Sequence, residues 1–130
     1  MRKYAVDMIG NSYYAATTDG WTSNANETYY SLCVHFITED WVLQELNLDI
    51  QKITGHTTAP DVDVHVNELL ERNHLDKGKL CCLVTDNEPT MNRFGQDCDY
   101  EWQGCIDHLI EICTGHAFDS GTSVDNLYYN

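Results

Sequence analysis

The sequence predicts a mixed α/β fold in which three antiparallel strands are followed by alternating helices and strands. Residues 28–38 alternate as a half-buried strand does, residues 61–74 repeat apolar side chains at helical spacing, and residues 79–86 form a continuous apolar run. With 130 residues, 42% of them hydrophobic, the chain is long enough to bury a core. We expect a partial domain over residues 1–116 and a loosely ordered polar tail over residues 117–130.

The first two strands are predicted on either side of a turn. The run SYYAAT, residues 12–17, begins the first strand, and Asp19 lies near the end of that strand region. Residues 28–38 form the second strand, after the turn residues SNANE. Because successive side chains of a strand point to opposite faces, we expect one apolar face on the second strand, made of Tyr30, Leu32, Val34 and Phe36.

A hairpin turn at TEDW, residues 38–41, is predicted to lead into a third strand that ends near residue 53. The apolar alternation of this third segment is imperfect, so a helix is a second interpretation. We expect Trp21 and Trp41 to pack against apolar neighbours, and His35 to be a hydrogen-bonded histidine of the core.

A helix and an interior strand are predicted next. Asp61 follows Pro60 and is expected to cap the helix, which ends near His74. Its apolar face contains Val62, Val66, Leu69 and Leu70. The run KLCCLVTD is then typical of a strand covered on both faces, and it ends at Asp86.

Two further elements follow Asp86. Pro89 is favourable in the first turn of a helix, with Asn87 or Glu88 near the cap. The segment WQGCIDHLIEIC, residues 102–113, predicts a short strand that leads into a helix.

The charge of the chain is strongly negative. Seven Lys and Arg residues against 21 Asp and Glu residues give a net charge of −14, and residues 94–130 contain no Lys or Arg. Such a surface repels phosphates, so we expect the chain by itself to bind nucleic acid poorly. No apolar run of about 18 residues is present, so no membrane span is expected. The adjacent Cys81 and Cys82 lie in an apolar run, as reduced core cysteines do, which indicates a reducing, intracellular setting.

Asp19 and Asp86 are the candidate metal ligands. Each closes a predicted strand, and these strands can be neighbours in the sheet, so the two carboxylates could converge. Converging carboxylates repel each other unless a cation or a proton intervenes. Mg²⁺ and related hard cations prefer such oxygen ligands. Spacing alone favours the plainer interpretation, in which Asp19 is a turn residue and Asp86 caps a helix.

Four motifs in a fixed order favour the metal-ligand interpretation of these two aspartates instead. TTDGWTS, YYSLCVHFITEDWVLQELNLDI, LVTDNEPTM and CIDHLIEI together resemble the catalytic core of hAT-type cut-and-paste DNA transposases. They are equally similar to the domesticated host proteins derived from that family, which often carry BED-type zinc fingers. The resemblance covers residues 17–112, which is most of the chain. The first and third motifs are specific in combination, whereas each alone is a weak signal.

The resemblance implies a ribonuclease H-like fold with an Asp, Asp, Glu triad that binds Mg²⁺ or Mn²⁺ and acts on DNA phosphodiesters. Asp19 matches the first acid and Asp86 the second. In the family the third acid lies far downstream, beyond a helical insertion, so the fold is expected to be incomplete at the C-terminus of this chain. None of the nearby acids takes that place, namely Glu88, Glu101 and Glu111. The residues that follow the Asp86 and Cys105 motifs also depart from the family pattern, which suggests a drifting copy.

Cys105 and His108 match the C-x-x-H motif of the family, and the resemblance implies that they support the active site from a neighbouring strand. Together with Cys113 and His116 they could instead form a zinc site, because zinc binds Cys and His in a tetrahedron. Their spacing is too short for a finger, so we take Cys113 and His116 as incidental.

Two functions from different classes follow from this sequence. The first is a fragment of a hAT-like transposase, acting in the nucleus within a longer parent protein that supplies the DNA contacts and any homo-oligomer, and inactive alone. The second is a domesticated, non-catalytic domain that binds protein partners in a nuclear regulator. The departures from the motifs and the charge of −14 favour the second for the chain in isolation.

Overall fold

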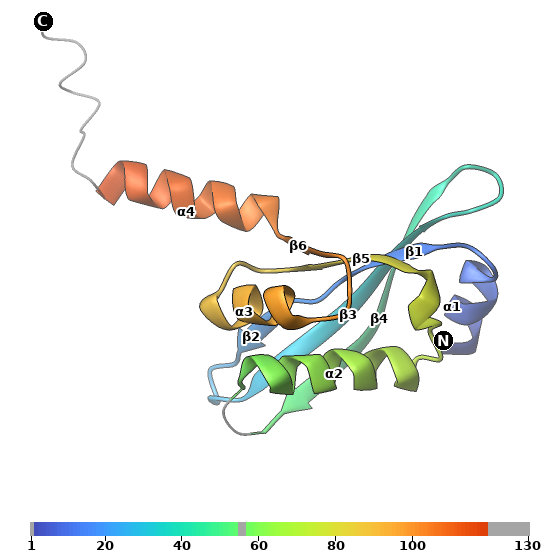
Figure 1. Cartoon of the computed structure of the whole chain (residues 1–130), viewed down its shortest axis with the longest axis horizontal. Coiled ribbons are helices and arrows are strands. Elements are labelled where there is room, and N and C mark those ends of the chain that lie inside the picture. The colour runs from blue at the N-terminus through green and yellow to red at the C-terminus, as the bar shows by residue number, and fades with distance from the viewer. Residues whose placement is uncertain (1, 55–56, 120–130) are drawn as a thin grey trace, which may run out of the picture.

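The computed structural model describes residues 2–54 and 57–119, and it confirms the mixed α/β class. The described residues form one six-stranded sheet, four α-helices and a 3-10 turn at Lys77–Lys79 (Figure 1). The elements, in chain order, are α1 (Arg2–Ile9), β1 (Tyr14–Thr17), β2 (Gly20–Thr22), β3 (Thr28–Ile37), β4 (Leu43–Ile53), α2 (Ala59–Arg72), β5 (Leu80–Thr85), α3 (Pro89–Asp97), β6 (Trp102–Gly104) and α4 (Ile106–Asp119).

The sheet is mixed, with β1 at its centre. Strand β3 is antiparallel to β1, β2 and β4, whereas β5 is parallel to both β1 and β6. The strands therefore lie in the order β4, β3, β1, β5, β6, and β2 pairs with β3 beyond the end of β1. This order confirms that the first strand and the strand ending before Asp86 are neighbours.

One face of the sheet carries the core. The predicted apolar face of β3 is confirmed, because Tyr30, Leu32, Val34 and Phe36 are all buried. Helices α2 and α3 lie against the same face of the sheet, while α4 projects from its other side (Figure 1). The side chains that fill the space between sheet and helices include Tyr14, Ala16, Leu69, Leu70, Leu83, Met91 and Phe94.

The segment for which a helix was a second interpretation is strand β4. Its alternation is imperfect because the pairing with β3 shifts by one residue: Leu32 lies opposite Asp49, but Cys33 lies opposite Asn47. Leu48 is therefore the extra residue of a β-bulge. Leu46 before the shift and Ile53 beyond it both pack against the core, although a strict period of two would place residues an odd number of positions apart on opposite faces.

The caps of α2 differ from the prediction. Thr58 is the N-cap, and Asp61 stands at the third helical position. The Asp61 Oδ2 atom accepts hydrogen bonds from the Thr58 N–H at 2.8 Å and from the Thr58 hydroxyl at 2.6 Å, as the acid of a capping box does. The helix ends at Arg72 with Asn73 as C-cap, and its predicted apolar face is buried as expected.

Other features of the fold differ from what the sequence predicted. Strand β5 is not covered on both faces, because Leu83 and Thr85 are buried on one face while Cys82 and Val84 on the other are only partly buried. Cys81, expected in the core, is exposed. Helix α1 was not predicted, and neither was β2. The boundary expected after residue 116 falls inside α4, and residues 120–130 lie outside the described part. Among the described helices, none has the length and apolar character that crossing a bilayer requires.

Asp49 ties β4 to the end of α2 and should make stability depend on pH. Its Oδ2 atom accepts hydrogen bonds from the Arg72 Nε–H at 2.9 Å and the Asn73 amide at 3.0 Å. Burial pushes the Asp49 pKa upward, but the bonds from Asn73 and Arg72 outweigh burial and hold the pKa below its ordinary value.

A carboxyl group with a lowered pKa stabilises the fold above its unfolded pKa of about 3.9 and loses this contribution as pH falls through the folded pKa. We expect Asp49→Asn to lower the free energy of unfolding at pH 7 by about 1 kcal/mol. The difference from wild type should shrink below about pH 4. Urea titrations of both proteins at several pH values measure it, and a difference that grew on acidification would contradict this role of Asp49.

Candidate functional site

The pairing of β1 with β5 brings Asp19 and Asp86 to one edge of the sheet. Thr17 lies opposite Val84 in this parallel pair, and the Thr18 N–H donates to the Val84 carbonyl at 2.9 Å. Two residues beyond each partner of the Thr17–Val84 pair are Asp19 and Asp86. Neighbouring strands lie about 4.8 Å apart, so the backbones that carry these two carboxylates leave the sheet side by side.

The two aspartates differ in their surroundings. Asp19 is exposed, and its carbonyl accepts a hydrogen bond from the Ser31 N–H at 3.0 Å, which fixes its backbone against β3. Asp86 is half-buried, and its Oδ1 atom accepts a hydrogen bond from the Glu88 N–H at 3.0 Å. Asp86 thus orders the turn into α3, as the plainer interpretation of its sequence expected, while its second carboxylate oxygen remains available to a ligand.

A buried threonine holds the turn at Asp86 in place. The Thr85 hydroxyl donates to the Asp86 carbonyl at 2.9 Å and accepts from the Trp102 indole N–H at 3.0 Å. The Thr85 carbonyl in turn accepts from the Cys105 N–H at 2.7 Å, and the Asn87 amide donates to the Cys105 carbonyl at 2.6 Å. The end of β5 is therefore fixed from the side of β6, which leaves Asp86 little freedom.

Asp86 also lines a small cavity of about 130 Å³, together with Gly20, Tyr30 and Glu88. Asp19 is not one of the lining residues, but it directly precedes Gly20. Burial raises the pKa of the Tyr30 hydroxyl, a hydrogen bond with Thr57 opposes the shift, and the charges of Asp86 and Glu88 add to it.

The donor set suits a hard divalent cation. Mg²⁺ typically takes one or two carboxylates, and it completes its shell with water and with phosphate oxygens of the substrate. Among the residues described, no group of three His, Cys, Asp and Glu side chains is arranged to hold a metal, and no ion pair engages Asp19 or Asp86. Asp19 and Asp86 are thus the two carboxylates that the described residues of this sheet edge could offer a cation.

Of the other predicted site residues, Cys105 lies next to the end of β5. Cys105 is bonded through its backbone to Thr85 and Asn87, and His108 is half-buried in the first turn of α4. Their supporting role remains a prediction. Cys113 is exposed, and the side chain of His116 lies outside the described part of the chain.

Sequence reasoning missed two features around these strands. Tyr30 was expected only as a core residue, yet it also lies over Gly20, where an added Cβ would overlap its ring. Trp41 was expected to pack, but its side chain is 87% exposed at the tip of the β3–β4 hairpin. Trp21 is 40% exposed and stacks on Tyr29, with ring centroids 5.7 Å apart. A positional signal existed for Trp41, because it directly follows the turn residues Glu39 and Asp40.

Comparison with known proteins gives two results. The family model of the ZBED1 RNase-like domain matches residues 17–99, which is more than half of the chain and includes both Asp19 and Asp86. Two Zea mays proteins, named "Putative AC transposase" and "Putative AC9 transposase", are each 29% identical over 107 residues. These matches cover 82% of this chain but only 13% and 12% of the respective relatives, so the chain spans a small part of their length.

Proposed function

Because the chain belongs to the family of the ZBED1 RNase-like domain and is related to hAT-type transposases, we propose that it is part of a transposase catalytic core. In the parent protein this core would cut and join DNA phosphodiesters in the nucleus. The observation that supports the proposal is the parallel pairing of β1 with β5, which sets Asp19 and Asp86 at adjacent strand ends. The chain alone would be inactive, since its described residues provide only two carboxylates for the cation.

In this proposal Asp19 and Asp86 hold Mg²⁺ or Mn²⁺. Such an ion would polarise a phosphodiester and lower the pKa of an attacking water. The residues of this chain position the carboxylates: Thr85 fixes the backbone at Asp86, and the Glu88 N–H orients one carboxylate oxygen. Cys105 and His108 would support that arrangement from β6 and α4. Contacts to DNA would come from basic parts of the parent protein, since this chain has a net charge of −14.

Mn²⁺ binding by the 130-residue chain tests the metal site directly. We expect Asp19→Asn and Asp86→Asn each to weaken Mn²⁺ affinity about tenfold, because each removes one of two negative ligands. Asp99→Asn, a change to an exposed loop carboxylate, is the matched control and should leave the affinity unchanged.

Paramagnetic broadening of amide NMR signals locates the ion in the same samples. Bound Mn²⁺ should broaden the signals of Gly20 and Asn87 first in the wild-type chain, and this pattern should disappear in both aspartate variants. Equal Mn²⁺ affinities in the wild type and both aspartate variants would show that Asp19 and Asp86 do not share a metal site.

A non-catalytic, protein-binding domain of a nuclear regulator is the second candidate. It is favoured by the lack of a third metal-binding side chain near the two aspartates among the described residues. A DNA nicking assay on the full-length parent protein separates the candidates. Nicking that is lost in Asp19→Asn would exclude the non-catalytic function, and intact DNA with Mn²⁺ bound would exclude the catalytic one.

A further inference from the structure

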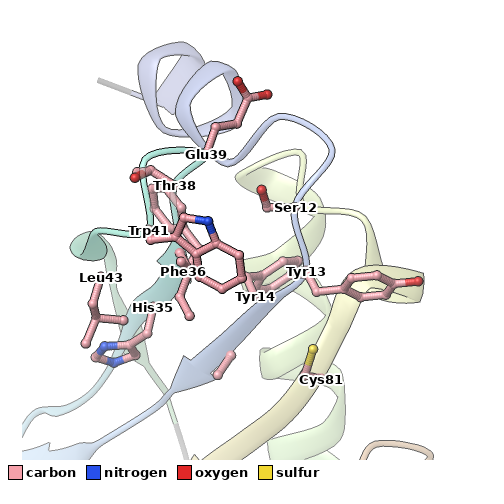
Figure 2. A pocket seen from close by; sticks show the side chains of 12 residues that line it. Ser12, Tyr13, Tyr14, His35, Phe36, Thr38, Glu39, Trp41, Leu43 and Cys81 are labelled. Carbon is pink, nitrogen blue, oxygen red and sulfur yellow. The ribbon is translucent and has the colours of Figure 1, made fainter.

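A groove at the opposite end of β1 has no role in the metal site. It has a volume of about 720 Å³ and is lined by apolar and aromatic residues, among them Tyr13, Tyr14, Phe36, Trp41 and Leu43 (Figure 2). Tyr14 and Phe36 belong to the buried core beside the groove, whereas Tyr13, Trp41 and Leu43 are 68%, 87% and 69% exposed. An exposed patch of this kind on a folded domain marks a surface that binds another molecule.

The backbone conformation of Trp41 is unfavourable for a bulky residue, and it leaves the indole exposed. Residues 39–41 form a three-residue hairpin loop, closed by hydrogen bonds from the Thr38 N–H to the Val42 carbonyl at 3.0 Å and from the Trp41 N–H to the Thr38 carbonyl at 2.9 Å. Trp41 has a φ of 61°, at the loop position that favours glycine or asparagine. A bulky residue is an outlier in this conformation, and outliers concentrate at functional sites. Folding gains little from an indole that is almost fully exposed, so binding is the better explanation.

The charge around the groove selects the kind of partner. Glu39 lies at the rim, with its carboxylate pointing away from the aromatic side chains in Figure 2, and Asp40 and Glu45 are exposed nearby. The sequence contains no Lys or Arg from residue 4 to residue 51. Lys79, which precedes β5, is hydrogen-bonded to the Gly10 carbonyl and the Asn11 side chain. Nucleic acid, an anionic membrane and a second copy with a charge of −14 would all be repelled.

We propose that this groove binds a basic polypeptide segment of a partner protein, in which a large apolar side chain is flanked by Lys or Arg. The apolar side chain would lie against Ile37 and Leu43, which face each other across β3 and β4 and line the groove. The neighbouring cation would stack on Trp41 or Tyr13 and approach Glu39, because aromatic faces attract Lys and Arg side chains. This inference does not depend on the metal site.

Selection from a random peptide display library on the 130-residue chain tests the proposal, with affinities then measured by fluorescence anisotropy. We expect the selected peptides to carry Lys or Arg beside a large apolar residue. They should bind Trp41→Gly and Trp41→Asn about tenfold or more weakly, as loss of an aromatic anchor does. Both variants should unfold at the same or higher urea concentration than wild type, because Gly and Asn suit a φ of 61°. Both should also keep Mn²⁺ binding, which separates this result from the metal-site test.

Neutralising the acidic residues at the rim of the groove is a second, independent test. Glu39→Gln combined with Asp40→Asn should weaken the selected peptides and reduce the salt dependence of their affinity, whereas Asp99→Asn should do neither. Failure to enrich any peptide, enrichment of acidic peptides, or equal binding to wild type and Trp41→Gly would each overturn the proposal. So would self-association in sedimentation experiments that Trp41→Gly abolishes, because a second copy would then be the occupant.

Discussion

Replacement of Phe94 by alanine is expected to lower the free energy of unfolding by about 3–5 kcal/mol. Phe94 is 1% exposed and lies in α3, which packs against α2 and β6. Removing its ring creates a cavity between the helices that close the core, and the surrounding elements can collapse only partly into it. Domains of this size have a total stability of about 5–15 kcal/mol, so the loss is a large fraction of it. Urea unfolding followed by far-UV circular dichroism measures the change.

Val64→Ala is the control for this experiment. Val64 lies on α2 but is 53% exposed, so its truncation should change the free energy of unfolding by no more than about 0.5 kcal/mol. If Phe94→Ala lowered the free energy of unfolding as little as Val64→Ala, then α3 would not pack against α2 as described. The outcome matters for the candidate site, because α3 begins three residues after Asp86 and holds that turn to the core.

Gly95→Ala should have the second-largest effect on stability. It should destabilise the protein, although a change from glycine to alanine inside a helix usually stabilises it. Alanine in a helix interior is ordinarily more stable than glycine by about 1 kcal/mol. At position 95, however, the added Cβ would overlap the indole ring of Trp102. Displacing that ring also breaks the hydrogen bond from its N–H to the Thr85 hydroxyl. We expect a net loss of about 1–3 kcal/mol, measured by urea unfolding.

Gly115→Ala makes the same substitution where the structure has open space. Gly115 lies in α4, and apart from its chain neighbours and its own helical backbone no described atom lies within 4 Å of the position that its Cβ would occupy. Here the ordinary helix propensity should apply, with no loss of stability and a gain of up to about 1 kcal/mol. Two glycine-to-alanine changes that both stabilised the protein would show that Trp102 does not pack on α3.

These contacts connect the stability of the domain to its candidate function. Trp102 packs on Gly95 and bonds to Thr85, and Thr85 bonds to the Asp86 backbone. A change at Gly95 should therefore also weaken Mn²⁺ binding, although it touches neither carboxylate. The peptide groove at Trp41 lies at the other end of β1, so we expect the two sites to respond to different substitutions.

Local patterns were sufficient for the main elements. The face of β3 made by Leu32 and Val34 and the face of α2 made by Val66 and Leu69 are buried as their spacing predicted. The reason is that period two and period 3.6 are properties of the backbone, and each element follows its own apolar side chains toward the core. Asp86 at the end of β5 followed from the same pattern.

Only the tertiary structure decided how these elements meet. The parallel pairing that sets Asp19 beside Asp86 depends on β5 crossing back next to β1 by way of α2, and no local pattern specifies that register. The bulge at Leu48 and the packing of Trp102 on Gly95 likewise depend on partners outside their own elements. The sequence by itself thus determined which residues turn inward, because burial of apolar area acts on each element separately. The long-range contacts between elements determined where the carboxylates lie.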